Sequence, residues 1–288
     1  MTTTDLDGPL LRSVSRSFYL SIRLLPQKLR APVGLAYLLA RASDTIADSA
    51  DLPAIEREKY LAAFLAMVRT GGREGLAEIR EHVRSPHAGE NELIAQLDRC
   101  LAWLESLPEF DRAEIRDVLG KIIRGQTLDV QRPALNNDAE LEEYCYLVAG
   151  CVGEFWTRVC VHHLPGYSSL PPDRLNALAG DFGKALQLVN ILRDLPEDVR
   201  AGRRYLRPDD FARWHERAVV LLESGREYIR SVRPARVRAG CFLPWDLARK
   251  TLALLTAPPS HRIKVPRSAV RATLCRTLLA ALSNAPLR

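Results

Sequence analysis

The sequence contains no stretch in which apolar and polar residues alternate, and it has no Asn-Gly dipeptide of the kind that closes a β-hairpin. It also lacks a G-x-G-x-x-G motif after a predicted strand, which argues against a dinucleotide-binding α/β fold. Apolar residues instead recur with a period of about 3.6, and the connectors between these stretches are short. We therefore predict an all-α protein that forms a single domain over residues 1–288.

Uncharged runs of membrane-spanning length are also missing. The uncharged helical run of residues 31–40 is bounded by Arg30 and Arg41 and is too short to cross a bilayer. Asp5 and Asp7 stand where a signal peptide would carry basic residues. We therefore expect a cytoplasmic protein, soluble or peripheral to the membrane, without an obligate protein partner.

The cysteines form no C-x-x-C pair and no regular framework, which argues against a zinc site or a disulfide scaffold. Cys160 lies near His162 and His163, but no second half of a zinc site follows at a suitable spacing. We expect the thiols to be small buried apolar groups in a reducing compartment. The six cysteines are Cys100, Cys145, Cys151, Cys160, Cys241 and Cys275.

The net charge of +6 favours anionic partners such as phosphorylated metabolites, anionic lipid surfaces or nucleic acid. No basic stripe is interleaved with aromatic residues, so we expect no nucleic-acid binding. Solubility with mild basicity is the plainer interpretation of the same charge.

The segment GKALQLVNILRDLPEDVRAGRRY, residues 183–205, carries the strongest signal. Its polar residues recur at steps of three or four and share one side of a helix that is otherwise aliphatic. Buried carboxylates without partners would cost several kcal/mol each, so they require cations or water. A divalent metal bridging to an anionic ligand satisfies them, although a solvated helix face is the common alternative. The polar residues are Gln187, Asn190, Asp194, Glu197 and Asp198, with Arg193 beside them.

A second segment, GLAYLLARASDTIAD, repeats this pattern with Tyr37, Arg41, Asp44 and Asp48 at steps of four, three and four. Two such helices facing each other would place two carboxylate clusters across a cavity. Mg²⁺ is usually bound by one or two carboxylates plus substrate phosphates, which suits each cluster. Within the first helix Pro196 should kink or end the α-helix near residues 192–195.

Four segments, in this order, resemble the successive signatures of the squalene/phytoene synthase family. They are SRSFYLSI at residues 15–22, ARASDTIAD at 40–48, YCYLVAGCVG at 144–153, and LQLVNILRDLPED followed by GRRYL at 186–206. The resemblance implies an isoprenoid-synthase helical bundle around a central cavity. It also implies head-to-head condensation of two prenyl diphosphates that requires Mg²⁺, with Mn²⁺ as an alternative.

The resemblance also implies roles for individual residues. Asp44 and Asp48 match the first aspartate-rich motif, Asp194 and Asp198 match the second, and Tyr144 matches a tyrosine near the reacting carbons. By resemblance the metal-binding residues are Asp44, Asp48, Asn190, Asp194, Glu197 and Asp198. The substrate-binding residues are Ser15, Arg16, Ser17, Tyr37, Arg41, Gln187, Asn190 and Arg193. Without the family resemblance, the plainer interpretation is that Tyr144 packs in the core and that Ser15 caps a helix.

Within the family, DTIAD and LPWDLARKTLALL resemble the squalene synthase branch, in its shorter, bacterial type without a hydrophobic tail. Arg262, Lys264 and Arg267 resemble the basic segment assigned to the phosphate of NADPH, although a solvated loop is an alternative. The implied reaction joins two farnesyl diphosphates through presqualene diphosphate and reduces the product to squalene. The alternatives are a phytoene or dehydrosqualene synthase that needs no reductant, a presqualene diphosphate synthase, and a non-catalytic assembly factor.

Overall fold

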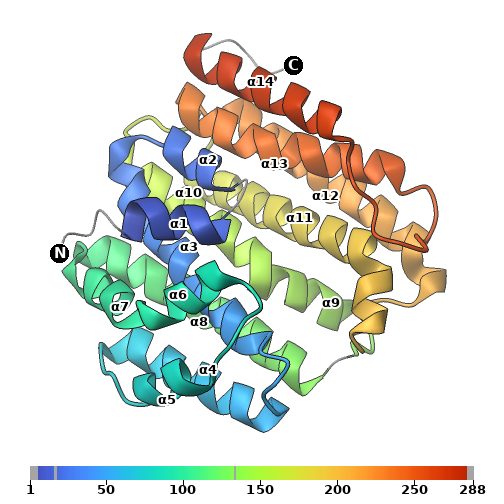
Figure 1. Cartoon of the computed structure of the whole chain (residues 1–288). Helices are drawn as coiled ribbons and strands as arrows, with labels where there is room; N and C mark the ends of the chain where they lie inside the picture. Colours follow the sequence, from blue (N-terminus) through green and yellow to red (C-terminus); the bar gives the residue numbers. More distant parts are fainter. Residues whose placement is uncertain (1–5, 16–17, 133, 284–288) are drawn as a thin grey trace. The chain divides into compact units, whose positions relative to one another are not determined.

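The computed structural model of the protein describes residues 6–15, 18–132 and 134–283. Within these residues every regular element is helical. Extended pairing is limited there to two isolated bridges, Ala134 with Arg204 and Ser168 with Val232. The predicted all-α class is therefore confirmed (Figure 1).

The chain divides into two compact units, each described here by itself. The first unit comprises the described residues up to Arg23 and from Gln27 to Arg132, and the second comprises Leu24–Pro26 and the described residues after Arg132. The prediction of a single domain stays a prediction.

The first unit contains one π-helix and eight α-helices among its described residues. One of them, α2, ends at the boundary between the units. They are η1 (Leu6–Leu10), α1 (Leu11–Ser15), α2 (Phe18–Leu24), α3 (Gln27–Ala47), α4 (Ala54–Thr70), α5 (Leu76–His82), α6 (Ala88–Ala95), α7 (Leu97–Ser106) and α8 (Glu109–Gln131).

The second unit holds the remaining elements. They are α9 (Asp138–Cys145), η2 (Tyr146–Gly150), α10 (Cys151–His163), α11 (Pro172–Arg200), η3 (Pro208–Asp210), α12 (Phe211–Ser231), α13 (Ala235–Leu254) and α14 (Arg267–Ser283).

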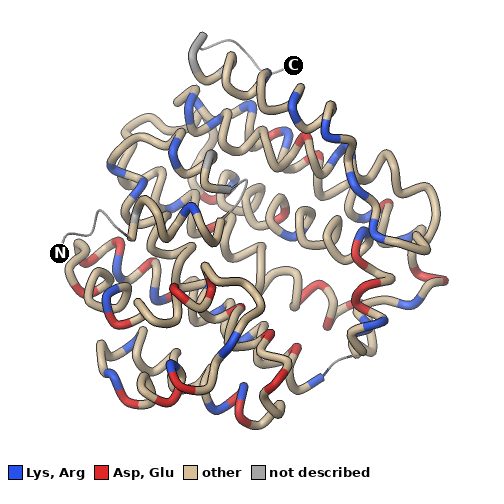
Figure 2. Tube along the Cα trace, in the orientation of Figure 1, with Lys and Arg blue, Asp and Glu red and all other residues tan. Residues whose placement is uncertain are grey.

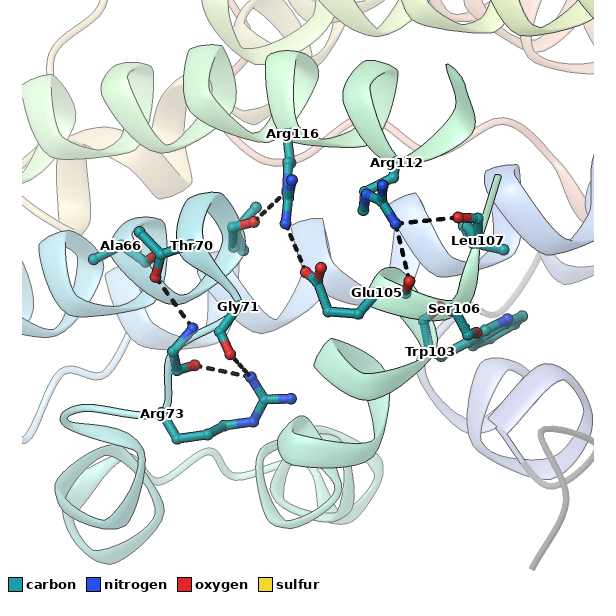
Figure 3. Close-up of polar contacts among 12 residues, drawn as sticks. Ala66, Thr70, Gly71, Arg73, Trp103, Glu105, Ser106, Leu107, Arg112 and Arg116 are labelled. Carbon is teal, nitrogen blue, oxygen red and sulfur yellow. Dashed lines mark hydrogen bonds and ion pairs between the residues drawn. The ribbon is translucent and has the colours of Figure 1, made fainter. Parts of the chain in front are cut away.

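In the first unit α3 packs against α8, and α4 packs on the same partner. Arginines on α8 connect this helix to its neighbours (Figure 3). Arg116 donates to the Val68 carbonyl at 2.9 Å and to the Glu105 carboxylate at 2.7 Å, so one side chain joins α8 to α4 and α7. One turn before Arg116 on α8, Arg112 donates to the Glu105 carbonyl at 3.0 Å. These contacts fix α8, against which α3 packs, to α4 and α7.

In the second unit α11 lies against α10, α12 and α13 (Figure 1). The approach of α11 to α10 and to the preceding η2 is close enough to require glycine. A Cβ atom on Gly153 would lie 2.1 Å from the Ala179 carbonyl oxygen, and one on Gly183 would lie 2.2 Å from that of Ala149. The small residues of YCYLVAGCVG are therefore explained by close contact with α11.

Prolines lie inside two helices of the second unit. Pro196 is predicted to kink or end its helix near residues 192–195, and it does not end it, because α11 continues to Arg200. Proline lacks an N–H donor, but helical bonding resumes beyond it, since the Ala201 N–H donates to the Glu197 carbonyl at 2.9 Å. Pro244 likewise lies inside a helix, α13.

Five of the six cysteines are buried, as predicted, and Cys275 on α14 is exposed. Burial raises the pKa of the Cys100 and Cys241 thiols to about 12, which makes them inert as nucleophiles. None of the described helices combines the length and the apolar composition that crossing a bilayer requires.

Candidate active site

The first acidic motif lies at the C-terminal end of α3, in the first unit. The Arg41 guanidinium lies 3.6 Å from the Asp44 carboxylate and 3.4 Å from the Tyr37 hydroxyl, and it stands over the Tyr37 ring. The backbone N–H of Asp48 donates to the Asp44 carbonyl at 2.8 Å, so Asp48 follows one helical turn later and is exposed. The structure therefore places Tyr37, Arg41 and Asp44 on one side of α3, with Asp48 as the first residue after the helix.

A glutamine on α8 completes this cluster. Gln126 is 7% exposed and donates from Nε2 to Asp44 Oδ1. Its Oε1 atom is buried and has no hydrogen-bond partner among the described residues. The sequence pattern did not single out Gln126; the signal available was an amide on the side of α8 that also buries Ile122 and Ile123.

The negative charge of the Asp44 carboxylate is only partly balanced by its neighbours. Although 41% of its side chain is exposed, protein atoms packed around the carboxyl group remove water from it, and this burial raises the pKa of Asp44 to about 6. Arg41 and the Gln126 amide lower this pKa, whereas the like charge of Asp48 raises it. A cation at the motif would favour the ionised form of both carboxylates.

The predicted diphosphate-contacting segment starts at the end of α1. Ser15 is 4% exposed and its hydroxyl donates to the Leu11 carbonyl of its own helix. Tyr37 of α3 donates to the Val14 carbonyl at 3.1 Å, so α1 is tied to the first acidic motif. Arg16 and Ser17 lie outside the described residues.

The second acidic motif lies on the last turns of α11, in the second unit. Arg193 donates from Nε to Asp194 at 2.8 Å and forms a second hydrogen bond to the other carboxylate oxygen. The Asp194 side chain is 20% exposed and that of Glu197 is 42% exposed. Asp198, one turn beyond Asp194, is half-buried.

A loop arginine also reaches this motif. Arg262, between α13 and α14, lies 2.9 Å from Asp194 and 3.3 Å from Glu197. Asp194 therefore has two guanidinium partners, one from its own helix and one from the loop. Spacing along the chain does not show this contact, because 68 residues separate Arg262 from Asp194.

The remaining predicted residues of this unit are spread along α9 and α11. Gln187 is half-buried and Asn190 is exposed. Tyr144 on α9 stacks on Tyr205, with ring centroids 5.0 Å apart at an interplanar angle of 19°. The Tyr144 hydroxyl donates to that of Tyr205 at 3.3 Å. Tyr205 is a second residue that the sequence pattern did not single out, although it lies within the GRRYL segment.

The donor chemistry of the first motif fits Mg²⁺. Asp44 and Asp48 supply carboxylate oxygens, and Gln126 supplies a buried amide oxygen without a donor among the described residues. In the described part of the chain, no group of three or more His, Cys, Asp or Glu is arranged to hold a metal ion by itself. Mg²⁺ commonly takes only one or two carboxylates and completes its shell with water and substrate phosphates, so the two observations agree.

The three residues predicted to bind NADPH have different surroundings. Arg262 is paired with the second acidic motif, whereas Lys264 and Arg267 are exposed. Lys264 in the loop and Arg267 at the start of α14 are therefore two exposed cations for a phosphate group. That the two acidic motifs face one another stays a prediction.

Comparison with known proteins decides the family. The model of the squalene/phytoene synthase family matches residues 11–215, most of the chain. The chain belongs to the squalene/phytoene synthase family. Both acidic motifs and Tyr144 lie inside the matched residues, and Arg262, Lys264 and Arg267 lie outside them.

Relatives from both branches of the family are equally similar to the chain. A bifunctional lycopene cyclase/phytoene synthase of Phycomyces blakesleeanus is 30% identical over 236 residues, which are 78% of this chain and 37% of the relative. A probable squalene synthase of Neurospora crassa is 30% identical over 201 residues, 68% of this chain and 40% of the relative. The chain thus spans about two fifths of the length of these two relatives.

The fold agrees with that of a solved structure. A complex of TcSQS with the ligand BPH1237 superposes with a TM-score of 0.81 at 22% identity, covering 97% of this chain and 89% of the other. This likeness confirms the predicted isoprenoid-synthase helical fold.

Proposed function

We propose that the protein is a prenyltransferase that joins two molecules of farnesyl diphosphate head to head and reduces the product to squalene. The observation that carries the proposal is the pair of acidic motifs, Asp44 with Asp48 and Asp194 with Asp198, both within the residues that match the family. Each motif would serve a diphosphate group.

Asp44 and Asp48, with the Gln126 amide oxygen, would hold Mg²⁺ in the first unit, and Asp194 and Asp198 would do so in the second. When bound, Mg²⁺ neutralises the negative charge that develops on a departing diphosphate. Arg41 and Arg193 stand beside these carboxylates and supply further positive charge for phosphate oxygens.

Loss of diphosphate leaves an allylic carbocation, which must be held away from water until it meets the second chain. Tyr144 would lie near the reacting carbons, and its stacking on Tyr205 fixes the orientation of its ring. An aromatic face stabilises a nearby cation without acting as a nucleophile.

The squalene branch further requires a hydride donor. Lys264 and Arg267 would hold the phosphate of NADPH, which supplies hydride when bound. The rival within the family is a phytoene or dehydrosqualene synthase, which releases a proton and needs no reductant. The equal similarity to a phytoene synthase supports this rival as the second candidate.

Purified protein incubated with farnesyl diphosphate and Mg²⁺, with and without NADPH, separates these functions. Squalene that appears only with NADPH supports the proposal. A C30 hydrocarbon formed without reductant, or turnover of geranylgeranyl diphosphate alone, supports the rival. Accumulation of presqualene diphosphate under both conditions would indicate an enzyme that stops after the first condensation.

A matched pair of variants tests whether the chemistry belongs to the motifs. Asp48→Asn removes a proposed metal ligand, whereas Asp51→Asn changes an exposed carboxylate three residues later. We expect condensation to be lost in the first variant and kept in the second. No turnover by the unaltered protein with any of these substrates would favour a non-catalytic role.

A further inference from the structure

The charge of the chain is unevenly distributed along the sequence. Residues 247–288 contain eight Lys and Arg and no Asp or Glu. The whole chain has 41 basic and 35 acidic residues, so residues 1–246 carry a net charge of −2. The positive charge of the protein therefore comes from its last 42 residues, of which α14 forms the largest helical part.

One side of α14 is fixed to α13. Thr273 is 0% exposed and donates to the Asp246 carboxylate at 2.7 Å. Thr277, 1% exposed, lies one turn later on the same side. The Arg276 guanidinium stands 5.6 Å from the centre of the Phe242 ring. These contacts determine which side of α14 faces away from α13.

The opposite side of α14 is basic at its start and apolar towards its end. Arg267 and Arg271 are exposed, and Leu278 and Leu279 are 47% and 65% exposed. Cys275 is exposed between the two pairs. A helix rises about 1.5 Å per residue, so Leu279 lies about 12 Å beyond Arg271 along the axis. Figure 2 shows the basic positions along α14 without an acidic one among its described residues.

Another exposed apolar pair in this unit lacks these features. Val219 and Val220 on α12 are 43% and 56% exposed, but the exposed acidic residues Glu216 and Glu223 lie within one turn of them. Exposed apolar groups beside cations, without acidic neighbours, are what a negatively charged lipid surface takes up.

We propose that α14 docks on the surface of a bilayer that contains anionic lipids. Arg267 and Arg271 lie at the level of the lipid phosphates, and the tilted C-terminal part of the helix inserts Leu278 and Leu279 among the outer acyl carbons. A soluble polyanion would neutralise the arginines but leave both leucines in water. Nucleic acid is disfavoured further because the described exposed face of α14 has no aromatic ring on which a base would stack. The docking does not require the condensation reaction, but it shares Arg267 with the NADPH contact proposed above, so NADPH and anionic lipid would compete for this side chain.

The first test is cosedimentation of the full chain with vesicles. We expect binding to an equal mixture of phosphatidylcholine and phosphatidylglycerol, weakened by salt, and little binding to phosphatidylcholine alone. The double variant R267Q/R271Q should lower the partition coefficient about thirtyfold, since each basic residue near such a surface contributes about 1 kcal/mol. L278S/L279S should lower it on the order of tenfold.

Matched controls carry the same chemical changes elsewhere in the unit. R230Q/R236Q removes the same charge from exposed positions on α12 and α13, and V219S/V220S removes exposed apolar groups from α12. Both should bind vesicles within about twofold of the unaltered protein, because these positions lie off α14.

A second measurement needs no substitution. Cys275 is the exposed cysteine and the other five are buried, so a maleimide fluorophore sensitive to polarity will label Cys275 selectively. Anionic vesicles should shift its emission to the blue, and a quencher attached to lipid chains should reduce it.

The proposal is overturned if the emission is unchanged on vesicles to which the protein binds. It is also overturned if both α14 variants bind like their controls, or if neutral vesicles bind equally well. Tighter binding to single-stranded DNA than to anionic vesicles, with L278S/L279S unaffected, would make the surface one for a soluble polyanion and would equally exclude lipid docking.

Discussion

The two acidic motifs share a sequence pattern but balance their charge in different ways. On α3, Asp44 accepts a hydrogen bond from the neutral amide of Gln126, and its arginine neighbour lies at 3.6 Å. On α11, Asp194 is held by Arg193 at 2.8 Å and by Arg262 at 2.9 Å. The first carboxylate thus has one distant cation, whereas the second has two close ones.

This difference teaches that a carboxylate pattern fixes the position of the negative charge but not its counter-ion. The partners of Asp44 come from helices α3 and α8, which are packed against each other. Half of the charge balance of Asp194 comes from a loop, which can release its arginine at lower cost than a packed helix can. We expect a metal cation to compete with one distant arginine, Arg41, at the first motif and with two close ones, Arg193 and Arg262, at the second.

Substitution of one aspartate in each motif has the largest expected effect. Asp44→Asn and Asp194→Asn should each lower the rate of condensation by about a hundred- to a thousandfold, because each removes a carboxylate that would hold the Mg²⁺ needed to stabilise the departing diphosphate. The measurement is product formation from farnesyl diphosphate and Mg²⁺, with thermal unfolding as the check on folding. Near-full activity in either variant would break the comparison, since that motif would then have no catalytic part.

A third carboxylate, Asp246, shows what a purely structural site looks like. It is 1% exposed and accepts hydrogen bonds from Lys250 and Thr273 at 2.7 Å and from Arg249 at 3.0 Å. Asp246→Ala should lower the free energy of unfolding by about 2 to 4 kcal/mol and leave condensation by the folded protein unchanged. Urea unfolding measures this loss, and Asp209→Ala, at an exposed position, is the control.

The pH dependence of stability sharpens the same point. Burial acts to raise the pKa of Asp246, but the hydrogen bonds from Lys250, Thr273 and Arg249 outweigh it, and the pKa is lowered. A lowered folded-state pKa contributes stability that is present above the unfolded value of about 3.9 and is lost as the pH falls through the folded pKa. The difference in unfolding free energy between the unaltered protein and Asp246→Ala should therefore shrink on acidification below that value. An unchanged difference would mean that packing, not charge, makes the contribution.

Removal of the loop arginine, Arg262, should have a smaller effect, and it should strengthen metal binding rather than weaken a property of the protein. Arg262→Gln should strengthen cation binding at the second motif by a few-fold up to about tenfold, because a partly exposed ion pair no longer competes. Binding of Mn²⁺ followed by its electron paramagnetic resonance signal measures this without any turnover. Lys264→Gln, on the same loop and exposed, is the matched control. Weaker binding in Arg262→Gln than in Lys264→Gln would show that the arginine helps to hold the site.

Much of the candidate site was predictable because it depends on helical spacing. Tyr37, Arg41, Asp44 and Asp48 are neighbours along one helix, so the steps of three and four residues place them together. Contacts between helices were not predictable in this way. Gln126 meets Asp44 across 82 residues and Arg262 meets Asp194 across 68, and no local pattern in a single sequence reports such pairs. Pro196 failed as a helix end for the same reason: local preference was outweighed by the packing of α11.

The smallest expected effect on turnover comes from removing a tyrosine hydroxyl, and each motif has a tyrosine in its unit for the comparison. Tyr37, beside the first motif, donates to the backbone carbonyl of Val14 at 3.1 Å, whereas Tyr144 donates to the hydroxyl of Tyr205 at 3.3 Å. Tyr205→Phe removes one long hydrogen bond but keeps the stacked ring, so we expect turnover to fall less than about threefold. Tyr37→Phe leaves a backbone carbonyl without its donor and should affect turnover more. Comparison of turnover numbers for the two variants measures this order, and a larger loss in Tyr205→Phe would assign to the Tyr205 hydroxyl a direct contact with the reacting groups.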